Sequence, residues 1–246
     1  FFTMLGTLVA GRISVAAASG SAAKTGLAIA IRYTDRRRQF GPAGGPEVPV
    51  LDYLALQRRL FPRLATTYAL EFAVDDLSRA FAERVAGDGD LREVEAIAAG
   101  LKAYASWHNV DTLQVCREAC GGNGYRAENR LGPLRADTDV FTTFEGDNHV
   151  LLQLVAKGLL TDYSSEFEEM DQFGMVRFVA GLAVETVLEK TNVHKLLERI
   201  KDVLPGGSSD EWDQEAGLLD PNYQLAMLRF REEHMIGGVA RRIQGR

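Results

Sequence analysis

The chain has 246 residues, of which 46% are hydrophobic and 25% are charged, a composition typical of a globular protein. Its formal net charge of -6 argues against a nucleic-acid-binding protein, despite short basic clusters at 36–38 and 241–242. The two cysteines, Cys116 and Cys120, form no disulfide framework, which favours a reducing compartment. Because the chain starts at Phe1 inside a helical pattern and ends without a cap signal, we interpret it as a fragment.

The first 18 residues are apolar like a secretory signal, but they lack a basic start and Arg12 interrupts them. Arg12 and Lys24 also leave no uncharged stretch near the roughly 20 residues that cross a bilayer. We therefore expect a soluble protein with no membrane span and no nucleic-acid partner. For its location we favour a bacterial cytoplasm over a peroxisome.

The first predicted element is a helix over 5–36, because apolar residues recur there at three- and four-residue steps. Its middle consists of Ala, Ser and Gly, which allows a neighbouring helix to approach closely. The glycines and prolines of 41–46 then predict a loop that runs to about Pro49.

A second helix is predicted over 50–85, where Pro62 should introduce a kink. Its predicted apolar face consists of Leu54, Phe61, Leu64, Tyr68, Phe72 and Leu77. A third helix is predicted from 90 to 119, and a fourth begins just after Glu145. Four antiparallel helices joined in this way predict an all-α fold, a four-helix bundle.

Other segments depart from this simple bundle. The insert from Gly121 to about Val140 looks irregular, and loops of this length are usually functional. The apolar run 140–144 is the one segment with a strand-like pattern. After residue 162 the composition shifts, and shorter helical patterns predict part of a second helical domain. These patterns lie at 173–188, 192–203 and 221–242. We therefore divide the chain into domains 1–162 and 163–246.

Glu145 is the most informative residue, because this carboxylate follows the apolar run and precedes Gly146. A poorly solvated carboxyl group has a raised pKa, which suits a general base near neutral pH. The alternative is a carboxylate stabilised by the positive end of the helix that follows it. The residues alone leave both interpretations open.

Two further segments could bind a ligand. The glycines of 121–124 follow a helix rather than a strand, which argues against a Rossmann fingerprint. They form either a helix cap or a backbone that a ligand approaches closely. The arginines of 36–38 suit phosphate groups, and the alternative is a solvated helix end. Arg12, on an apolar helix, needs either a substrate or a structural carboxylate as its partner.

A metal site is not predicted. Cys116, Cys120 and His108 lack a fourth ligand at a suitable spacing, so we expect buried, inert thiols. A di-iron bundle would require Glu-x-x-His on two helices, and the sequence contains no such motif.

Three segments resemble the flavin-dependent acyl-CoA oxidases, which are close relatives of the acyl-CoA dehydrogenases. These segments are AIRYTDRRRQFG at 30–41, CREACGGNGY at 116–125 and TTFEGDN at 142–148. They occur in the family's order across nearly two-thirds of the chain. The resemblance implies the C-terminal helical portion of such an enzyme, with a four-helix bundle followed by part of a second helical domain.

The resemblance also implies roles for individual residues. Glu145 would be the catalytic base, and Arg12 and Gly146 would lie at the substrate. The residues implied to contact FAD are Arg37, Gln39, Phe40, Glu118, Gly121, Gly122, Asp147 and Asn148. In the family, the contacts corresponding to 37–40 and 121–124 reach the FAD of a neighbouring subunit, which implies a homodimer or a higher homo-oligomer.

The implied reaction is desaturation of a fatty acyl-CoA to trans-2-enoyl-CoA in fatty acid β-oxidation, with O2 as acceptor and H2O2 as product. The alternatives are an acyl-CoA dehydrogenase that passes electrons to a flavoprotein, and a non-catalytic helical assembly module. CREACGG and EGDN favour the oxidase. Since the flavin ring of these enzymes is held mainly by a preceding β-domain, we expect the isolated fragment to be inactive.

Overall fold

The structure, a computed structural model, describes residues 2–87, 89–169 and 219–244. These residues are helical apart from turns and one isolated bridge between Arg38 and Pro49, which confirms the all-α prediction. The chain divides into two compact units, 1–157 and 158–246. The helical patterns predicted at 173–188 and 192–203 lie outside the described residues.

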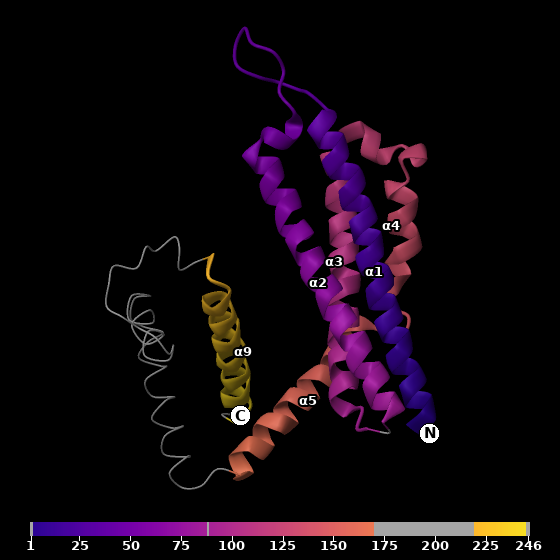
Figure 1. The fold of residues 1–246 in the computed structure, drawn as a ribbon, viewed down its shortest axis with the longest axis vertical. Coiled ribbons are helices and arrows are strands. Elements are labelled where there is room, and N and C mark those ends of the chain that lie inside the picture. Colours follow the sequence, from indigo (N-terminus) through magenta and orange to yellow (C-terminus); the bar gives the residue numbers. More distant parts are fainter. Residues whose placement is uncertain (1, 88, 170–218, 245–246) are drawn as a thin grey trace, which may run out of the picture. The chain divides into compact units, whose positions relative to one another are not determined.

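The first unit is built on three long helices that alternate in direction (Figure 1). They are α1 (Phe2–Arg36), α2 (Leu54–Ala86) and α3 (Arg92–Ala119). Each contacts the other two, and a short 3-10 helix, Val50–Asp52, precedes α2. The first three predicted helices are therefore confirmed.

Small residues let α1 and α3 pack closely, as the Ala-rich pattern of α1 predicts. On α1, Ala16, Ala23 and Ala30 are at most 1% exposed, and α3 contributes its own buried alanines. Larger apolar side chains form three core clusters along the bundle. Leu27, Leu60 and Leu131 belong to one cluster, Leu70 and Val74 to a second, and Val9, Ile13, Leu77 and Val94 to a third.

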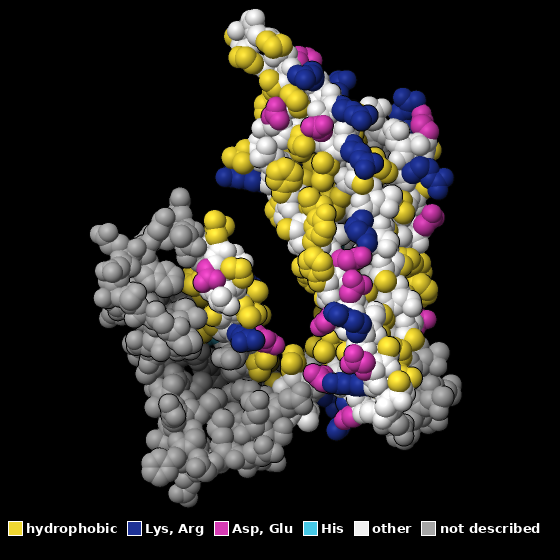
Figure 2. Space-filling model, in the orientation of Figure 1, with side chains coloured by type: hydrophobic (Ala, Val, Ile, Leu, Met, Phe, Trp, Pro, Cys, Tyr) yellow, Lys and Arg dark blue, Asp and Glu magenta, His cyan; other side chains and the backbone are white. Residues whose placement is uncertain are grey.

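The face of α2 that packs into the bundle differs from the predicted one. Its buried residues are Leu60, Thr67, Leu70, Val74 and Leu77. Of the predicted face only Leu77 is buried, whereas Leu54, Phe61, Tyr68 and Phe72 are exposed. Apolar side chains are accordingly visible on the surface of the bundle (Figure 2). The helix carries two apolar stripes, and periodicity alone does not say which one contacts α1 and α3.

The insert after α3 is helical rather than irregular. It contains 3-10 helices Gly121–Tyr125 and Ala127–Asn129, then α4 (Leu131–Asp139). Hydrogen bonds from Arg135 to Gln114 (3.0 Å) and from Asn109 to Thr138 (2.8 Å) fix α4 beside α3. Short helices with Gly and Pro in them give only a weak signal in a sequence.

The strand-like run at 140–144 is also helical, which corrects the sequence interpretation. Val140–Thr142 is a 3-10 helix, and the amides of Thr143 and Phe144 donate to the Val140 carbonyl oxygen at 3.0 and 3.1 Å. These local hydrogen bonds satisfy the backbone without a neighbouring strand.

The predicted fourth helix begins where expected, as α5 (Asn148–Glu169). Its first residues belong to the first unit, where Leu151 is buried. In the second unit the described residues include α9 (Pro221–Gln244), which confirms the helix predicted at 221–242.

One described helix, the part of α1 from Leu8 to Arg36, is long and apolar enough to cross a membrane. Half of its most apolar window is buried inside the bundle. The central helix of a bundle has the same length and composition, so this feature follows from the packing of α1 against α2 and α3.

Candidate active site

Glu145 lies on a strained turn between the 3-10 helix and α5. Its φ of 56° is in the left-handed region, which a residue with a side chain rarely adopts, and Gly146 follows at 109°. A Cβ on Gly146 would lie 2.8 Å from Leu151 Cδ2, so this position also has no space for a side chain. Strain of this kind costs roughly 1–3 kcal/mol and is concentrated at functional sites.

The Glu145 carboxylate lies against α1 at Gly11. A Cβ built on Gly11 would be 2.4 Å from Glu145 Oε2 and 2.7 Å from Cδ. The missing side chain of Gly11 therefore provides the space for the carboxylate. The side chain that caps α5 is Asp147, whose Oδ1 accepts the amide of His149 at 2.9 Å. Stabilisation of Glu145 by the start of this helix stays an alternative prediction.

Arg12 approaches the same turn from α1. It is 9% exposed, and its Nη1 lies 3.5 Å from Glu95 Oε1. Its Nε makes an equally long hydrogen bond, also 3.5 Å, to the Glu145 carbonyl oxygen. The structural carboxylate that the sequence left open is thus Glu95, and contact of Arg12 with substrate stays a prediction.

Lys102 of α3 contacts the turn from the interior, and the sequence reasoning missed it. This residue is fully buried, and its Nζ donates to the Gly146 carbonyl oxygen at 2.6 Å and to Asn148 Oδ1 at 3.0 Å. Burial lowers the pKa of Lys102, an effect that the carboxylates of Asp147 and Glu145 oppose. The one available signal was a lysine within a run of small and apolar residues.

Asn148 completes this buried group. It is 1% exposed, and its Nδ2 donates to the Ala103 carbonyl oxygen at 3.2 Å and to Ser106 Oγ at 2.9 Å. Its oxygen accepts from Lys102, so both ends of the amide are used inside the bundle. Contact of Asn148 with FAD remains a prediction for which these bonds offer no support.

A second group of predicted residues lies in the hairpin between α1 and α2, drawn at the top of Figure 1. Gln39 and Phe40 pair with Val48 through backbone hydrogen bonds of 3.0 and 2.9 Å. Phe40 adopts a φ of 62° and is 69% exposed. Arg37 and Gln39 are exposed, and their side chains have no partner among the described residues.

The glycine loop at 121–124 lies at the same end of the bundle. Asn123 Nδ2 donates to the hydroxyl of Tyr33 on α1 at 2.9 Å. The Cβ positions of Gly121 and Gly122 face open space, whereas a Cβ on Gly124 would lie 1.9 Å from the Arg117 carbonyl oxygen. Gly121 and Gly122 can therefore present backbone to a ligand, and Gly124 serves the packing.

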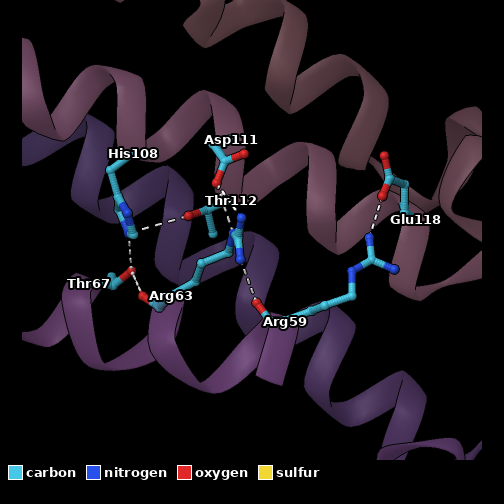
Figure 3. A network of polar contacts seen from close by, with 7 residues as sticks. All are labelled: Arg59, Arg63, Thr67, His108, Asp111, Thr112 and Glu118. Atoms are coloured by element: carbon cyan, nitrogen blue, oxygen red, sulfur yellow. Dashed lines mark hydrogen bonds and ion pairs between the residues drawn. The ribbon is translucent and has the colours of Figure 1, made fainter. Parts of the chain in front are cut away.

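Glu118 belongs to a network of polar contacts between α2 and α3 (Figure 3). It forms an ion pair with Arg59 and accepts a 2.7 Å hydrogen bond from Gln114, which lowers the pKa of the Glu118 carboxyl. Further along the network, burial lowers the pKa of His108, whose Nε2 lies 2.9 Å from Thr67 Oγ1.

Cys116 and Cys120 are buried and free. Burial raises the pKa of the Cys116 thiol to about 12 and that of Cys120 to about 11. Within the described ranges, no group of three His, Cys, Asp or Glu side chains is placed to hold a metal ion.

The predicted residues thus form two groups. We call Arg12, Glu145, Gly146, Asp147 and Asn148 the base region, and Arg37, Gln39, Phe40, Glu118, Gly121 and Gly122 the cofactor region. At about 1.5 Å per residue, α1 separates Gly11 from Arg36 by about 37 Å. One copy of the chain therefore holds the two regions far apart.

The helical bundle and the motif segments that it carries place the chain in one class, the helical domains of the acyl-CoA oxidase type. The family model for the "Acyl-CoA oxidase, C-alpha1 domain" matches residues 5–160. The chain belongs to the acyl-CoA oxidase family.

Individual relatives agree with this assignment. Peroxisomal acyl-coenzyme A oxidase 2 of Arabidopsis thaliana is 40% identical over 246 residues, covering 99% of this chain and 33% of the relative. The crystal structure of an acyl-CoA oxidase from tomato (Lycopersicon esculentum) has 30% identity and a TM-score of 0.74, covering 96% of this chain and 34% of that one. The chain thus spans about a third of the length of these relatives.

A second similar structure is acyl-CoA oxidase-2 of Caenorhabditis elegans bound with FAD, ascaroside-CoA and ATP. It has 26% identity and a TM-score of 0.63, covering 69% of this chain and 27% of that chain.

The expected bacterial cytoplasm is wrong. Relatives from Arabidopsis thaliana and Homo sapiens are named peroxisomal acyl-coenzyme A oxidases, which points to peroxisomes. Composition and cysteine count did not separate these two compartments, because both are compatible with free, buried thiols.

Proposed function

We propose that this chain is the base-bearing helical part of an FAD-dependent acyl-CoA oxidase that converts a fatty acyl-CoA to trans-2-enoyl-CoA. One observation carries the proposal. The Glu145 carboxylate, within the TTFEGDN segment, is held on a strained turn against Gly11. We assign the base and cofactor contacts to residues 1–162, and residues 163–246 to part of a second helical domain.

Glu145 would remove the proton from the carbon next to the thioester carbonyl group. The electron pair of that C–H bond then forms the double bond while a hydride leaves the adjacent carbon. When bound, FAD supplies the acceptor for this hydride and is reoxidised by O2, which gives H2O2. The lack of a side chain on Gly146 would let its backbone pack against the thioester, and Arg12 contacts the backbone of the base itself.

The donor set of the cofactor region fits the phosphate end of FAD. The Arg37 guanidinium pairs well with phosphate oxygens, and the Gln39 amide adds a neutral donor. Both are exposed, and the backbone at Gly121 and Gly122 is open to a ligand. The C. elegans relative crystallised with FAD supports the same cofactor for this family.

The separation of the two regions supports a homodimer or a higher homo-oligomer. About 37 Å along α1 exceeds the length of one extended dinucleotide, so a flavin beside Glu145 would not reach Arg37 of the same copy. The cofactor region would instead contact the FAD that a neighbouring copy uses, as the family resemblance implies.

Glu145→Gln tests the function in the complete enzyme, because it keeps the shape of the side chain and removes the base. We expect acyl-CoA still to bind, while flavin reduction slows by about 10²–10⁴-fold, the usual effect of a positioned base. Anaerobic single-turnover bleaching of the flavin measures this step apart from product release. The matched control Asp139→Asn should reduce its flavin normally. A near wild-type rate in Glu145→Gln would exclude Glu145 as the base.

A separate experiment tests which electron acceptor the enzyme uses. With acyl-CoA and no added electron carrier, an oxidase consumes O2 and produces H2O2, whereas a dehydrogenase does neither. Desaturation that depends on an added electron acceptor would replace the oxidase assignment with the dehydrogenase.

A further inference from the structure

We infer that Lys102 is a positioning residue for the base: from inside the bundle it holds the turn that directs the Glu145 carboxylate onto Gly11. The inference rests on the proposed function of Glu145, and it adds a residue that touches neither substrate nor flavin. Three observations carry it.

The first observation is the way in which the turn is held. Two successive carbonyl oxygens, those of Glu145 and Gly146, accept hydrogen bonds from two cations. The first faces Arg12 on α1 at 3.5 Å, and the second faces Lys102 on α3 at 2.6 Å. The shorter contact with Lys102 is the stronger of the two.

The second observation is the strain that these contacts oppose. The positive φ of Glu145 persists only when the surrounding structure determines it, whereas Gly146 adopts its positive φ without strain. Among the described residues, the side chains that hold this backbone by hydrogen bonds are Arg12 and Lys102. Asn148 in turn fixes the Lys102 ammonium group through its own three hydrogen bonds.

The third observation is the location of the charge. Lys102 is fully buried. Its sequence neighbours on α3, Ala99, Ala103 and Ala105, are buried as well. A buried charge is costly, and an apolar residue of similar size often gives a more stable protein. A lysine at this position is therefore better explained by the turn that it holds than by the stability of the bundle.

Lys102→Met in the complete enzyme removes the donor and keeps the length of the side chain. We expect flavin reduction to slow by about 10- to 100-fold, because a displacement of about 1 Å can cost as much as 100-fold in rate. The dissociation constant for acyl-CoA should change little, since Lys102 does not contact the ligand. Lys24→Met is the matched control, because Lys24 pairs with Glu71 at the surface, and it should behave as wild type. An unchanged reduction rate in Lys102→Met would overturn the inference.

The double variant separates positioning from a general structural role. If Lys102 acts through the base, Lys102→Met should slow reduction little further in a Glu145→Gln background. If Lys102→Met lowered the rate of flavin reduction by the same factor in both backgrounds, Lys102 would act through another group. That result would contradict the inference.

Hydrogen exchange supplies a readout that does not need the reaction. Amides of 144–147 should exchange faster in Lys102→Met, while those of the α1–α3 core keep their protection. Unchanged exchange at 144–147 would contradict the inference. If wild-type enzyme reduced no flavin with acyl-CoA, the proposed function would fail, and the exchange result would still decide whether Lys102 holds the turn.

Gly11→Ala provides a second variant if Lys102→Met does not fold. Alanine is the better helix former by roughly 0.5–1 kcal/mol, so the helix itself should not lose stability. Its Cβ would occupy the place of the Glu145 carboxylate, which must move aside. We expect slower flavin reduction, again by about 10- to 100-fold, at an unchanged melting temperature. A wild-type rate would show that this carboxylate position is not required.

Discussion

The base region and the cofactor region are built in opposite ways. Beside Glu145, the side chains of Lys102, Asn148 and Arg12 are at most 9% exposed, and each is hydrogen-bonded within the chain. In the cofactor region the side chains of Arg37, Gln39 and Phe40 are exposed on a backbone hairpin. If the proposed roles hold, the chain positions its base by itself and presents its cofactor contacts to something outside the chain.

The two regions should therefore respond differently to substitution. Changes in the base region should alter the rate of the chemical step, whereas changes in the cofactor region should alter cofactor retention. The exception is a residue next to the cofactor region that the packing of the glycine loop requires.

Gly124 is such a residue, and its substitution should have the largest effect on stability. The Cβ of Gly124→Ala would lie 1.9 Å from the Arg117 carbonyl oxygen, a backbone atom that cannot move aside without moving the loop. We expect the free energy of unfolding to fall by about 2–3 kcal/mol. Denaturant unfolding of the purified protein measures it. The control is Gly122→Ala, whose Cβ faces open space, and equal stability of the two variants would contradict this account of the loop.

Arg37→Glu should have a smaller effect, confined to the cofactor. Replacing the cation with an anion beside the phosphates should weaken FAD retention about tenfold, or roughly 1.4 kcal/mol. Titration of the FAD-depleted protein with FAD measures the change. Arg79→Glu, at an exposed position of α2, is the control and should retain FAD as wild type does. Unaltered FAD affinity in Arg37→Glu would remove Arg37 from the cofactor region.

His108 lies on α3 between the two regions. Of the changes considered, its titration should have the smallest effect, a pH-dependent loss of stability. Burial lowers the pKa of His108 in the folded state, so the unfolded state binds the proton more readily. Stability should therefore decrease as the pH falls through the ordinary histidine range near 6.5. The hydroxyls of Thr67 and Thr112 face the ring (Figure 3), and the nearby charges that act on it are those of Arg63 and Asp111. Between pH 7.5 and 5.5, the melting temperature of His108→Gln should depend less on pH than that of the wild type. An identical pH dependence in both proteins would exclude His108 as the cause of the loss of stability.

The long helices were predictable from sequence because their breaks are chemically explicit. Glycines and prolines at 41–46 end α1, and apolar residues at helical spacing define the helices on either side. Glu145 was singled out because its motif combines an apolar run, one acid and a glycine, and its role as the base stays a prediction. These are local features, and local features can be read from a sequence.

What could not be predicted depends on contacts between distant segments. The buried stripe of α2 was misassigned because Phe61 and Phe72 follow the helical repeat as well as Leu60 does. Lys102 and Gly11 are each more than 40 residues from Glu145 in sequence, and neither belongs to a motif. Their proposed roles depend on the fold, which brings α1 and α3 into contact with the turn.

The most direct test of this account mixes two defective copies of the complete enzyme, one carrying Glu145→Gln and the other Arg37→Glu. Each alone should be impaired, Glu145→Gln in the rate of flavin reduction and Arg37→Glu in the share of its sites that retain FAD. If the cofactor region serves the flavin of the neighbouring copy, a mixed dimer contains one site with an intact base and an intact cofactor region. The mixed dimer, isolated with two different affinity tags, should then recover about half of the wild-type rate of flavin reduction. If both regions served one site within a single copy, every site of the mixed dimer would carry one defect, and no recovery beyond the parent variants would contradict the account.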